Sequence, residues 1–234
     1  MLNGMLLINK PPGVTSHDVV QLARRKLAVR RIGHTGTLDP IAEGLLILLV
    51  GPATHYQRMF QAHEKTYEAI LRLGTQTDTA DAAGAPTRTA PVPVLDRARA
   101  AQVLASFCGP LSQTPPAYSA VKVKGRPAYW WARHRQPVAL APRVVHLSEM
   151  VLVNHTPETI TFRVRCSAGT YVRTLAEAIA ERLGTVGHLA HLVRTRIGEW
   201  TIDEAKPLSW LQGASPDLVA AQLKPCELSQ ALTP

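Results

Sequence analysis

Hydrophobic and polar residues follow two kinds of pattern along the chain, and together the patterns predict interleaved helices and β-strands. Short apolar or alternating stretches predict strands, whereas apolar residues three and four positions apart predict helices. Ser16, Asp96 and Thr170 are residue types that commonly cap the start of a helix. We therefore expect strands at residues 5–8, 45–50, 67–73, 119–123, 144–153 and 159–166, and helices at residues 16–28, 96–107, 126–135 and 170–184.

The remaining segments bear on the fold class and the domain organisation. Residues 154–158 predict a hairpin connection, residues 75–90 a polar loop, and residues 188–197 either a strand or a helix. The predicted order contains no repeating strand–helix–strand unit of the kind that builds a parallel sheet. We therefore expect an α+β fold with a mixed, largely antiparallel sheet flanked by helices. Residues 1–206 would form this domain and residues 207–234 a linker-like C-terminal tail.

Length and composition narrow the class of protein. The chain has 234 residues, of which 46% are hydrophobic and 18% charged, a balance typical of a globular domain with a sizeable core. The apolar run at residues 45–50 is far shorter than the roughly 18 residues of a membrane-spanning helix. Residues 1–8 do not resemble a secretory signal. Three cysteines without a C-x-x-C spacing exclude a disulfide framework and a cysteine-based zinc site. We expect a cytoplasmic protein.

Positive charge is concentrated in one segment of the chain. The 26 Lys and Arg residues exceed the 17 Asp and Glu residues by nine. Between Arg97 and Ser148 there is no acidic residue, although this segment holds eight of the basic ones. Tyr118, Trp130 and other aromatic residues lie among these cations. Cations neutralise phosphates and aromatic faces stack on unpaired bases, so the segment predicts nucleic-acid binding.

A second basic cluster lies at the end of the first predicted helix. It consists of Arg24, Arg25 and Lys26, followed by Arg30 and Arg31. Cations in the last turn of a helix offset its dipole, which is one explanation of the cluster. Binding of a polyanion is the other, and the sequence leaves both open.

The candidate chemistry centres on residues 33–44. Two glycines and a proline around His34 and Asp39 impose a defined backbone path beside an apolar strand. Asp39-Pro40 either opens a turn or presents a lone carboxylate as nucleophile or base. The sequence lacks the common phosphate-binding and zinc-protease motifs. His188 and His191 have no third ligand nearby in sequence, so we expect no metal site.

A family resemblance resolves this ambiguity. Residues 33–46, GHTGTLDPIAEGLL, resemble the catalytic motif of the bacterial tRNA pseudouridine-55 synthases, the TruB type. Four further motifs resemble that family in the same order along the chain. They are LINKPPG with Thr15-Ser16 near the N-terminus, KTY with LGTQTDTAD at residues 65–81, PPAYSAVK with Gly125-Arg126, and CSAGTYVRTL at residues 166–175.

The resemblance implies a role for each matched residue. Asp39 would be the catalytic aspartate, and Arg173 would pair with it and keep it ionised. Tyr67 would stack on the target uracil, and His34 would fill the space that the flipped uridine leaves. The remaining implied residues are Tyr171 and Leu192, which would line the same pocket, and Lys10, which would support the site structurally.

The resemblance also implies the fold, the substrate and the partners. We expect the pseudouridine synthase fold with an RNA-gripping insertion, acting on the T-loop uridine at position 55 of tRNA. No metal, cofactor, membrane or obligatory protein partner is expected, and the protein would be a monomer. Tyr118, Lys122, Lys124 and Arg126 would contact the T-arm. The chain departs from the family in having Val193 before Arg194, and in ending where relatives commonly continue into an RNA-binding PUA domain.

Other functions remain compatible with these residues. The chain could be a non-catalytic tRNA-binding chaperone of the same fold, or a synthase for another uridine. A basic carboxylate hydrolase would require a second acid near Asp39, where Glu43 is the nearest candidate. The chemical intermediate is also open: the carboxylate could add to the base, add to C1′, or remove the 2′ proton to give a glycal.

Overall fold

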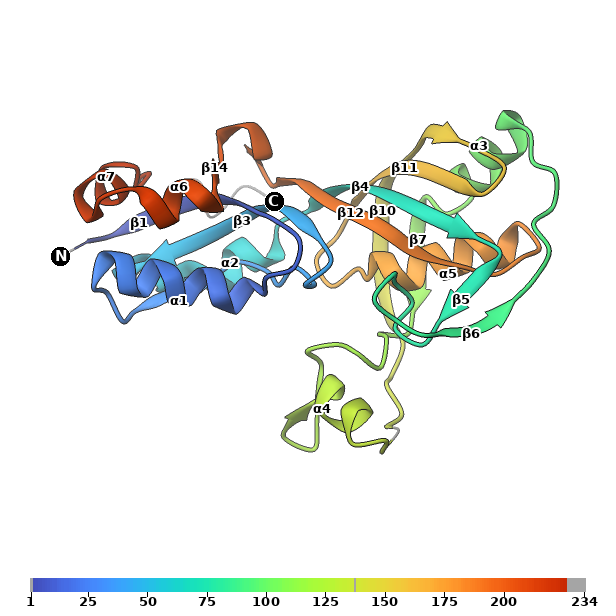
Figure 1. Ribbon diagram of the computed structural model, residues 1–234, viewed down its shortest axis with the longest axis horizontal. Helices are drawn as coiled ribbons and strands as arrows, with labels where there is room; N and C mark the ends of the chain where they lie inside the picture. The colour runs from blue at the N-terminus through green and yellow to red at the C-terminus, as the bar shows by residue number, and fades with distance from the viewer. Residues whose placement is uncertain (1, 137, 227–234) are drawn as a thin grey trace. The chain divides into compact units, whose positions relative to one another are not determined.

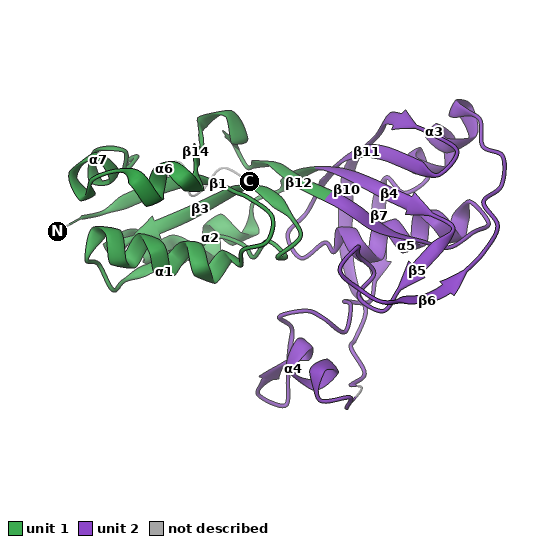
Figure 2. Ribbon diagram, in the orientation of Figure 1, with its two compact units in different colours: residues 1–67, 192–234 green, residues 68–191 purple. Residues whose placement is uncertain are grey.

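We describe the protein from a computed structural model, which defines residues 2–136 and 138–226. The chain forms two compact units (Figure 2). Unit 1 comprises residues 1–67 and 192–234, and unit 2 comprises residues 68–191. Strands β4 (Lys65–Leu73) and β12 (Gly187–Ile197) carry the chain from one unit to the other.

Unit 1 is built on a mixed sheet with the strand order β14-β1-β3-β12 (Figure 1). These strands are β14 (Lys206–Pro207), β1 (Gly4–Lys10), β3 (Glu43–Val50) and the second part of β12. Strand β3 is antiparallel to β1 and parallel to β12. From the second residue of β3 onward every position is buried, which explains its unbroken apolar sequence. The short strands β2 (Ile32–His34) and β13 (Trp200–Thr201) pair with β3 and β12.

Helix α1 (Ser16–Leu27) buries the predicted apolar stripe of unit 1, including Val19, Val20 and Ala23. Its N-cap is Thr15, so the prediction of Ser16 as the cap was wrong. The Thr15 side chain accepts the Asp18 N–H, and the Asp18 carboxylate accepts the Thr15 N–H, which completes a capping box. Ser16 is the first helical residue, and its hydroxyl bonds the backbone of Leu38 instead of capping the helix. The last turn of α1 ends at Ala28 in the left-handed conformation.

The other helical segments of unit 1 include two where the sequence suggested a tail. Helices α6 (Leu208–Gly213) and α7 (Pro216–Ala221) contact α1 and bury Leu208, Leu211 and Val219, so these residues are folded. The burial of these apolar side chains against unit 1 explains why the segment is folded although its sequence resembles a linker. The remaining segments are η1 (Gly51–Tyr56), α2 (Gln57–Ala62) and η2 (Ile202–Glu204).

Unit 2 contains a second run of strands in the order β4-β11-β10-β7. The predicted hairpin is present as β10 (Arg143–His155) and β11 (Thr159–Cys166), and β7 (Gly109–Gln113) pairs antiparallel with β10. Helices α3 (Arg97–Ala105) and α5 (Val172–Arg182) belong to this unit. Helix α3 has the predicted Asp96 cap, whereas α5 begins after Tyr171 and not at Thr170.

Two predicted coil or ambiguous segments of unit 2 are strands. Residues 75–90, expected to be a loop, contain the hairpin β5 (Thr75–Thr77) and β6 (Pro86–Thr89). Residues 188–197, which fitted a strand or a helix, lie in β12. Both segments are strands because their backbones pair with neighbouring strands, and this pairing cannot be predicted from the local sequence.

A small projection completes unit 2, and we call residues 118–135 the basic module. It contains the hairpin β8 (Lys122–Val123) and β9 (Arg126–Pro127), followed by α4 (Ala128–Arg133). The hairpin turns through Lys124 and Gly125, both with positive φ. Figure 1 shows α4 apart from the strands of unit 2.

The architecture confirms the expected class: helices flank a mixed, mostly antiparallel set of strands. No helix within residues 2–136 and 138–226 is both long and apolar enough to cross a membrane.

Candidate active site

Asp39 lies in the loop between β2 and β3 of unit 1, and the main chain on both sides of it is anchored. The buried Ser16 hydroxyl accepts the Leu38 N–H at 2.8 Å and donates to the Leu38 carbonyl at 3.2 Å. The Gly13 N–H donates to the Pro40 carbonyl at 2.8 Å. Because both neighbours of Asp39 are bonded to residues 13–16, the start of α1 and the preceding turn fix the main-chain position from which the Asp39 side chain projects.

Arg194 on β12 holds the same loop from another side. Its side chain is almost fully buried, with 1% of its surface exposed. The guanidinium donates to the carbonyls of Leu45 at 2.8 Å and Gly36 at 3.0 Å, with a longer contact to Thr37 at 3.4 Å. These contacts join the beginning of the loop to strand β3, where the loop ends.

The surroundings of Gly44 explain why this chain has a glycine at this position of the motif. It has φ +109°, and a Cβ placed there would lie 2.3 Å from the Arg194 carbonyl oxygen. Gly44 also pairs with Arg194 across the parallel strands β3 and β12. Only a residue without a side chain allows the two strands to approach so closely.

The charges around the loop shift the pKa values of two candidate residues. Burial, followed by repulsion from Arg194, lowers the pKa of Lys10 to about 8, while Asp39 and Glu43 act in the opposite direction. Burial and Arg194 also lower the pKa of His34 to about 4, so this imidazole is neutral near pH 7. The His34 Nδ1 accepts the Gly36 N–H at 3.3 Å, which fits the neutral form.

Three other predicted residues of unit 1 are positioned by strands or by local bonds. Tyr67 on β4 and Leu192 on β12 are buried. Lys10 at the end of β1 donates to the carbonyls of Pro11 at 3.0 Å and Val14 at 2.9 Å. It thereby holds the turn whose Gly13 N–H donates to Pro40, while its role in supporting the site stays a prediction.

Arg173 is held within unit 2 by residues from two other motifs of the sequence. It lies in the first turn of α5 and is buried, with 4% of its surface exposed. Its guanidinium donates to the carbonyls of Thr79 at 3.1 Å and Tyr118 at 2.8 Å. Its Nε lies 3.7 Å from a carboxylate oxygen of Asp81. Since Asp39 belongs to the other unit, its pairing with Arg173 stays a prediction.

Gln113 holds the backbone of Tyr171 and was missed by the sequence analysis. The buried side-chain amide of Gln113 accepts the Tyr171 N–H at 2.7 Å and donates to the Tyr171 carbonyl at 3.0 Å. This two-way pair fixes the residue from which α5 begins. Gln113 lies outside the elements that the sequence predicts, and a single glutamine there is not a specific signal.

The basic module presents its cations to solvent. Lys122, Lys124 and Arg126 are exposed, whereas Tyr118 is half-buried and uses its carbonyl to hold Arg173. The Arg126 guanidinium lies 4.4 Å from the centre of the Trp130 ring, and His134 stacks on the same ring at 3.9 Å. The Trp131 indole N–H donates to the Val123 carbonyl at 3.0 Å, which ties α4 to the hairpin.

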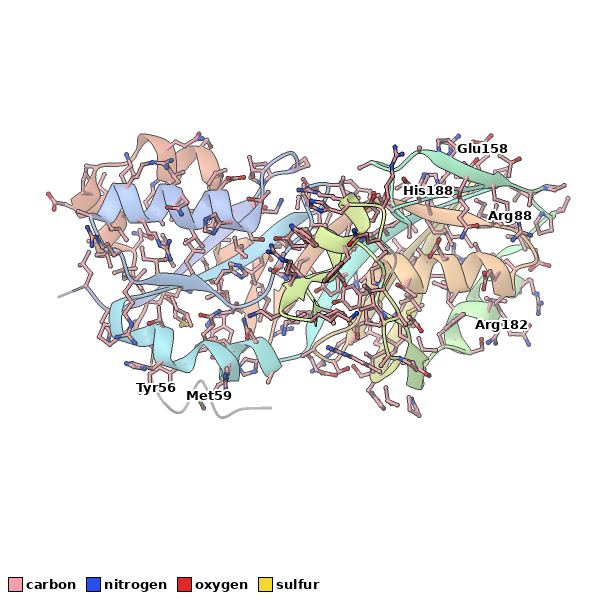
Figure 3. All side chains as sticks on the ribbon, turned by 90° about the horizontal axis from the view of Figure 1, so that it is seen from below. Tyr56, Met59, Arg88, Glu158, Arg182 and His188 are labelled. Carbon is pink, nitrogen blue, oxygen red and sulfur yellow. The ribbon has the colours of Figure 1, made fainter. Side chains whose placement is uncertain are left out.

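The histidine pair considered as a metal site, His188 and His191, lies in β12. His188, labelled in Figure 3, contacts the Thr75 carbonyl through Nδ1 at 2.7 Å. Among the residues that the structure describes, no group of three His, Cys, Asp or Glu side chains could hold a metal ion.

Comparison with known proteins identifies the family. Residues 24–172 match the family model described as TruB family pseudouridylate synthase (N terminal domain). The chain therefore belongs to the TruB family of pseudouridylate synthases. It is 44% identical over 227 residues to a protein of Aromatoleum aromaticum named tRNA pseudouridine synthase B, with 97% of this chain and 73% of that protein aligned. A protein of the same name from Hydrogenovibrio crunogenus is 43% identical, covering 90% of this chain and 70% of the relative.

A solved structure supports the fold. The crystal structure of a Cbf5-Nop10-Gar1 complex contains a chain that matches with a TM-score of 0.71 and 26% identity. The match covers 98% of this chain, which spans 61% of that longer one. The pseudouridine synthase fold expected from the sequence is thus confirmed.

Proposed function

We propose that this protein converts the T-loop uridine at position 55 of tRNA to pseudouridine, with Asp39 as the catalytic carboxylate. Membership of the TruB family, with relatives named tRNA pseudouridine synthase B, makes the protein an isomerase that acts on uridine in tRNA. The single observation that supports Asp39 is its place on a loop whose main chain is bonded immediately before and after it. A single carboxylate held in this way suits a reaction at one defined carbon atom.

The reaction is an internal rearrangement of one nucleotide. The N1–C1′ bond breaks, the uracil turns, C5 bonds to C1′, and the C5 proton is released to solvent while N1 gains a proton. Substrate and product are isomers, so no electrons enter or leave. Asp39 would act on C1′, on the base or on the 2′ proton, and a fixed, ionised carboxylate serves each route. The buried guanidinium of Arg173 would keep that carboxylate charged.

The remaining residues of the proposed site would bind the extruded nucleotide and its RNA. A base within a helical stack is inaccessible, so the uridine would be flipped out. The neutral His34 would occupy the vacated space without adding a charge, while Tyr67, Tyr171 and Leu192 would enclose the base. The cations of the basic module would hold the T-arm. We further propose that the protein acts in the cytoplasm without a protein partner.

Tritium release from C5 tests this proposal directly. A tRNA transcript labelled at C5 of uridine is incubated with the wild type, with Asp39→Asn and with Asp203→Asn, an exposed carboxylate of unit 1 that serves as the matched control. We expect one tritium per tRNA from the wild type and the control, and at least about a 10⁴-fold slower release from Asp39→Asn.

Replacing the position-55 uridine by cytidine should abolish release as well. Equal release from the cytidine-containing transcript would disprove the site of action. Undiminished release by Asp39→Asn would disprove the aspartate. Tight tRNA binding by the wild type without any release would instead favour the non-catalytic chaperone.

A further inference from the structure

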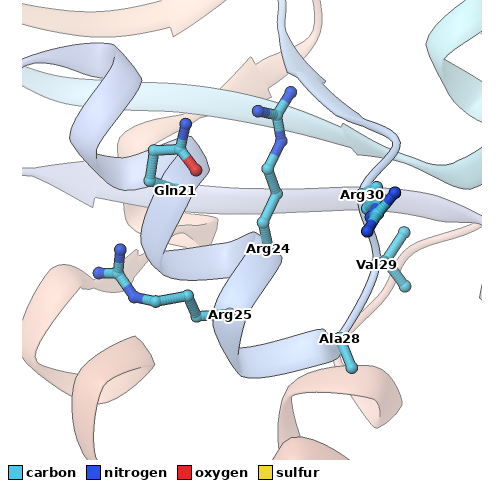
Figure 4. A pocket seen from close by; sticks show the side chains of 6 residues that line it. All are labelled: Gln21, Arg24, Arg25, Ala28, Val29 and Arg30. Atoms are coloured by element: carbon cyan, nitrogen blue, oxygen red, sulfur yellow. The ribbon is translucent and has the colours of Figure 1, made fainter.

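Part of the basic cluster at the end of α1 lines an open concavity of about 530 Å³ in unit 1 (Figure 4). The proposed function assigns no role to these residues. Three arginines line the concavity, and no acidic residue does. The lining residues are Gln21, Arg24, Arg25, Ala28, Val29 and Arg30.

The helix dipole does not account for all of this charge. Arg24 donates to the Ile32 carbonyl at 2.8 Å and so fastens the chain after α1 back onto the helix. Arg30 lies beyond the end of the helix. Within residues 2–136 and 138–226, neither the Arg25 nor the Arg30 side chain has a hydrogen-bond or ion-pair partner, and both residues are exposed. Two guanidinium groups are thus available to a ligand.

The shape and chemistry of the concavity favour a phosphodiester backbone. A guanidinium group can donate two parallel N–H hydrogen bonds to the oxygens of one phosphate. Small-molecule sites are usually enclosed and mostly apolar, whereas this surface is open and cationic. We infer that Arg25 and Arg30 bind backbone phosphates of the tRNA, in addition to the phosphates that the basic module would hold. This inference rests on the proposed function, because it takes tRNA as the ligand.

The test compares two double variants that lose the same charge. Arg25→Gln/Arg30→Gln removes the two unpartnered arginines, and Arg72→Gln/Arg163→Gln removes two exposed arginines that pair with Glu158 and Glu68. Binding of tRNA is measured by fluorescence anisotropy at several salt concentrations. For the first variant we expect the slope of log K against log salt to fall by roughly 1 to 2, with little change in the control.

The outcomes separate this inference from the proposed function. Equal changes of the slope in both double variants would show a general charge effect and would contradict tRNA binding by Arg25 and Arg30. An unchanged slope in the first variant would contradict it as well. Tritium release by the wild type is measured on the same preparation. If tritium release is absent, the proposed function is wrong. Normal release together with an unchanged slope would contradict only the binding of tRNA by Arg25 and Arg30.

A second inference rests on the buried side chain of Arg194. The Arg194 guanidinium donates hydrogen bonds to carbonyl groups at the beginning of the Asp39 loop and to a carbonyl group on strand β3, which follows the loop. A cation with 1% exposure is costly to bury unless its donors are used, and here they are used on the loop. The geometry points to Arg194 as a positioning residue that sets the loop, and through it the Asp39 carboxylate.

Single-turnover kinetics distinguish positioning from general stability. We compare Arg194→Gln and Arg194→Lys with Arg196→Gln, an exposed arginine on the same strand whose guanidinium contacts the Gly198 and Glu199 carbonyls. For Arg194→Gln we expect the rate per folded molecule to fall about 10²-fold, since small displacements of a reacting group have effects of that size. The tRNA Kd should remain within about threefold of the wild type, because a buried guanidinium that is bonded to the protein's own carbonyls has no surface to offer the RNA.

The conservative variant keeps this test decisive. Arg194→Lys should retain part of the rate, because an ammonium reaches some of the same carbonyls without the planar fork. Thermal melting gives the folded fraction for each variant, and if the glutamine variant does not fold, the lysine variant alone is compared with the control. A wild-type rate in folded molecules, or a rate and a Kd that change by the same factor, would overturn the role.

Discussion

In the loop that carries Asp39, protein atoms bond backbone groups at Gly36, Leu38 and Pro40, while the cations of the basic module project into solvent. Both regions are assigned to the same reaction, yet they are constructed differently. The loop belongs to unit 1 and lies between two strands, and the module is a small hairpin and helix of unit 2.

The difference reflects what each region is proposed to do. Attack on one atom requires a carboxylate whose direction is set before the substrate arrives, so backbone bonds around it are useful. Phosphate binding depends mainly on charge and tolerates adjustment of long side chains, so exposed lysines and arginines suffice. Changes in the loop should therefore affect the rate, and changes in the module should affect affinity.

A pair of glycine substitutions gives the largest expected contrast. Gly44→Ala would force a Cβ against the Arg194 carbonyl at a position with φ +109°. Gly125→Ala in the module has φ +81° but meets no atom within 4 Å. We expect Gly44→Ala to lower the free energy of unfolding by about 3 kcal/mol and to abolish tritium release. Gly125→Ala should lower it by about 1 kcal/mol and remain active.

Urea unfolding and tritium release on both variants check this contrast. Comparable destabilisation by the two substitutions would mean that backbone strain alone, and not the close approach of β3 to β12, requires Gly44. Full activity of Gly44→Ala would contradict our description of the loop.

Neutralising the module should have the next largest effect. In Lys122→Gln/Lys124→Gln/Arg126→Gln we expect tRNA binding to weaken roughly 10- to 100-fold near physiological salt, with a shallower salt dependence. The rate at saturating tRNA should stay near that of the wild type, because these exposed side chains do not hold the loop. Filter binding and multiple-turnover tritium release measure the two quantities. A large loss of the saturated rate with normal binding would reverse the division of roles.

The sequence predicted the elements better than it predicted what holds the site. The apolar stripe of α1 and the hairpin of β10 and β11 follow local periodicity and were confirmed. Thr15 and Ser16 are both residue types that can cap a helix. The choice between them depends on Leu38, 22 residues away, which occupies the Ser16 hydroxyl. No local pattern carries that information.

The same limit applies to the residues that the sequence analysis missed. Arg194 is separated by 149 residues from the Leu45 carbonyl that it bonds, and Gln113 by 58 residues from Tyr171. Arg194 lay in a segment that fitted a strand or a helix, and Gln113 lay outside the predicted elements, so neither position gave a sign of burial or of a distant partner. Motif resemblance pointed to Asp39 and Arg173, but long-range backbone bonds position the groups around them.

A smaller effect is expected from Gln113. Gln113→Leu would leave the partly buried backbone N–H and carbonyl of Tyr171 without their amide partner, which costs about 1 kcal/mol in stability. If Tyr171 lines the uracil pocket as proposed, single-turnover tritium release should slow about tenfold. The matched control is Gln102→Leu on the exposed face of α3, which should change neither quantity. An unchanged rate with reduced stability would assign Gln113 to the fold alone.

The smallest expected effect is a change in how stability depends on pH. The folded pKa of Lys10, about 8, lies below its ordinary value of 10.5, so between these values the unfolded chain binds more protons than the folded one. The free energy of unfolding contributed by this group therefore rises as the pH increases from about 8 to 10.5. Lys10→Met should remove that rise, whatever it does to absolute stability. Urea unfolding across this range, with the exposed Lys124→Met of the basic module as control, measures the slope. Identical slopes in all three proteins would mean that Lys10 is not buried as a charge beside Arg194, and would weaken the contrast between the two regions.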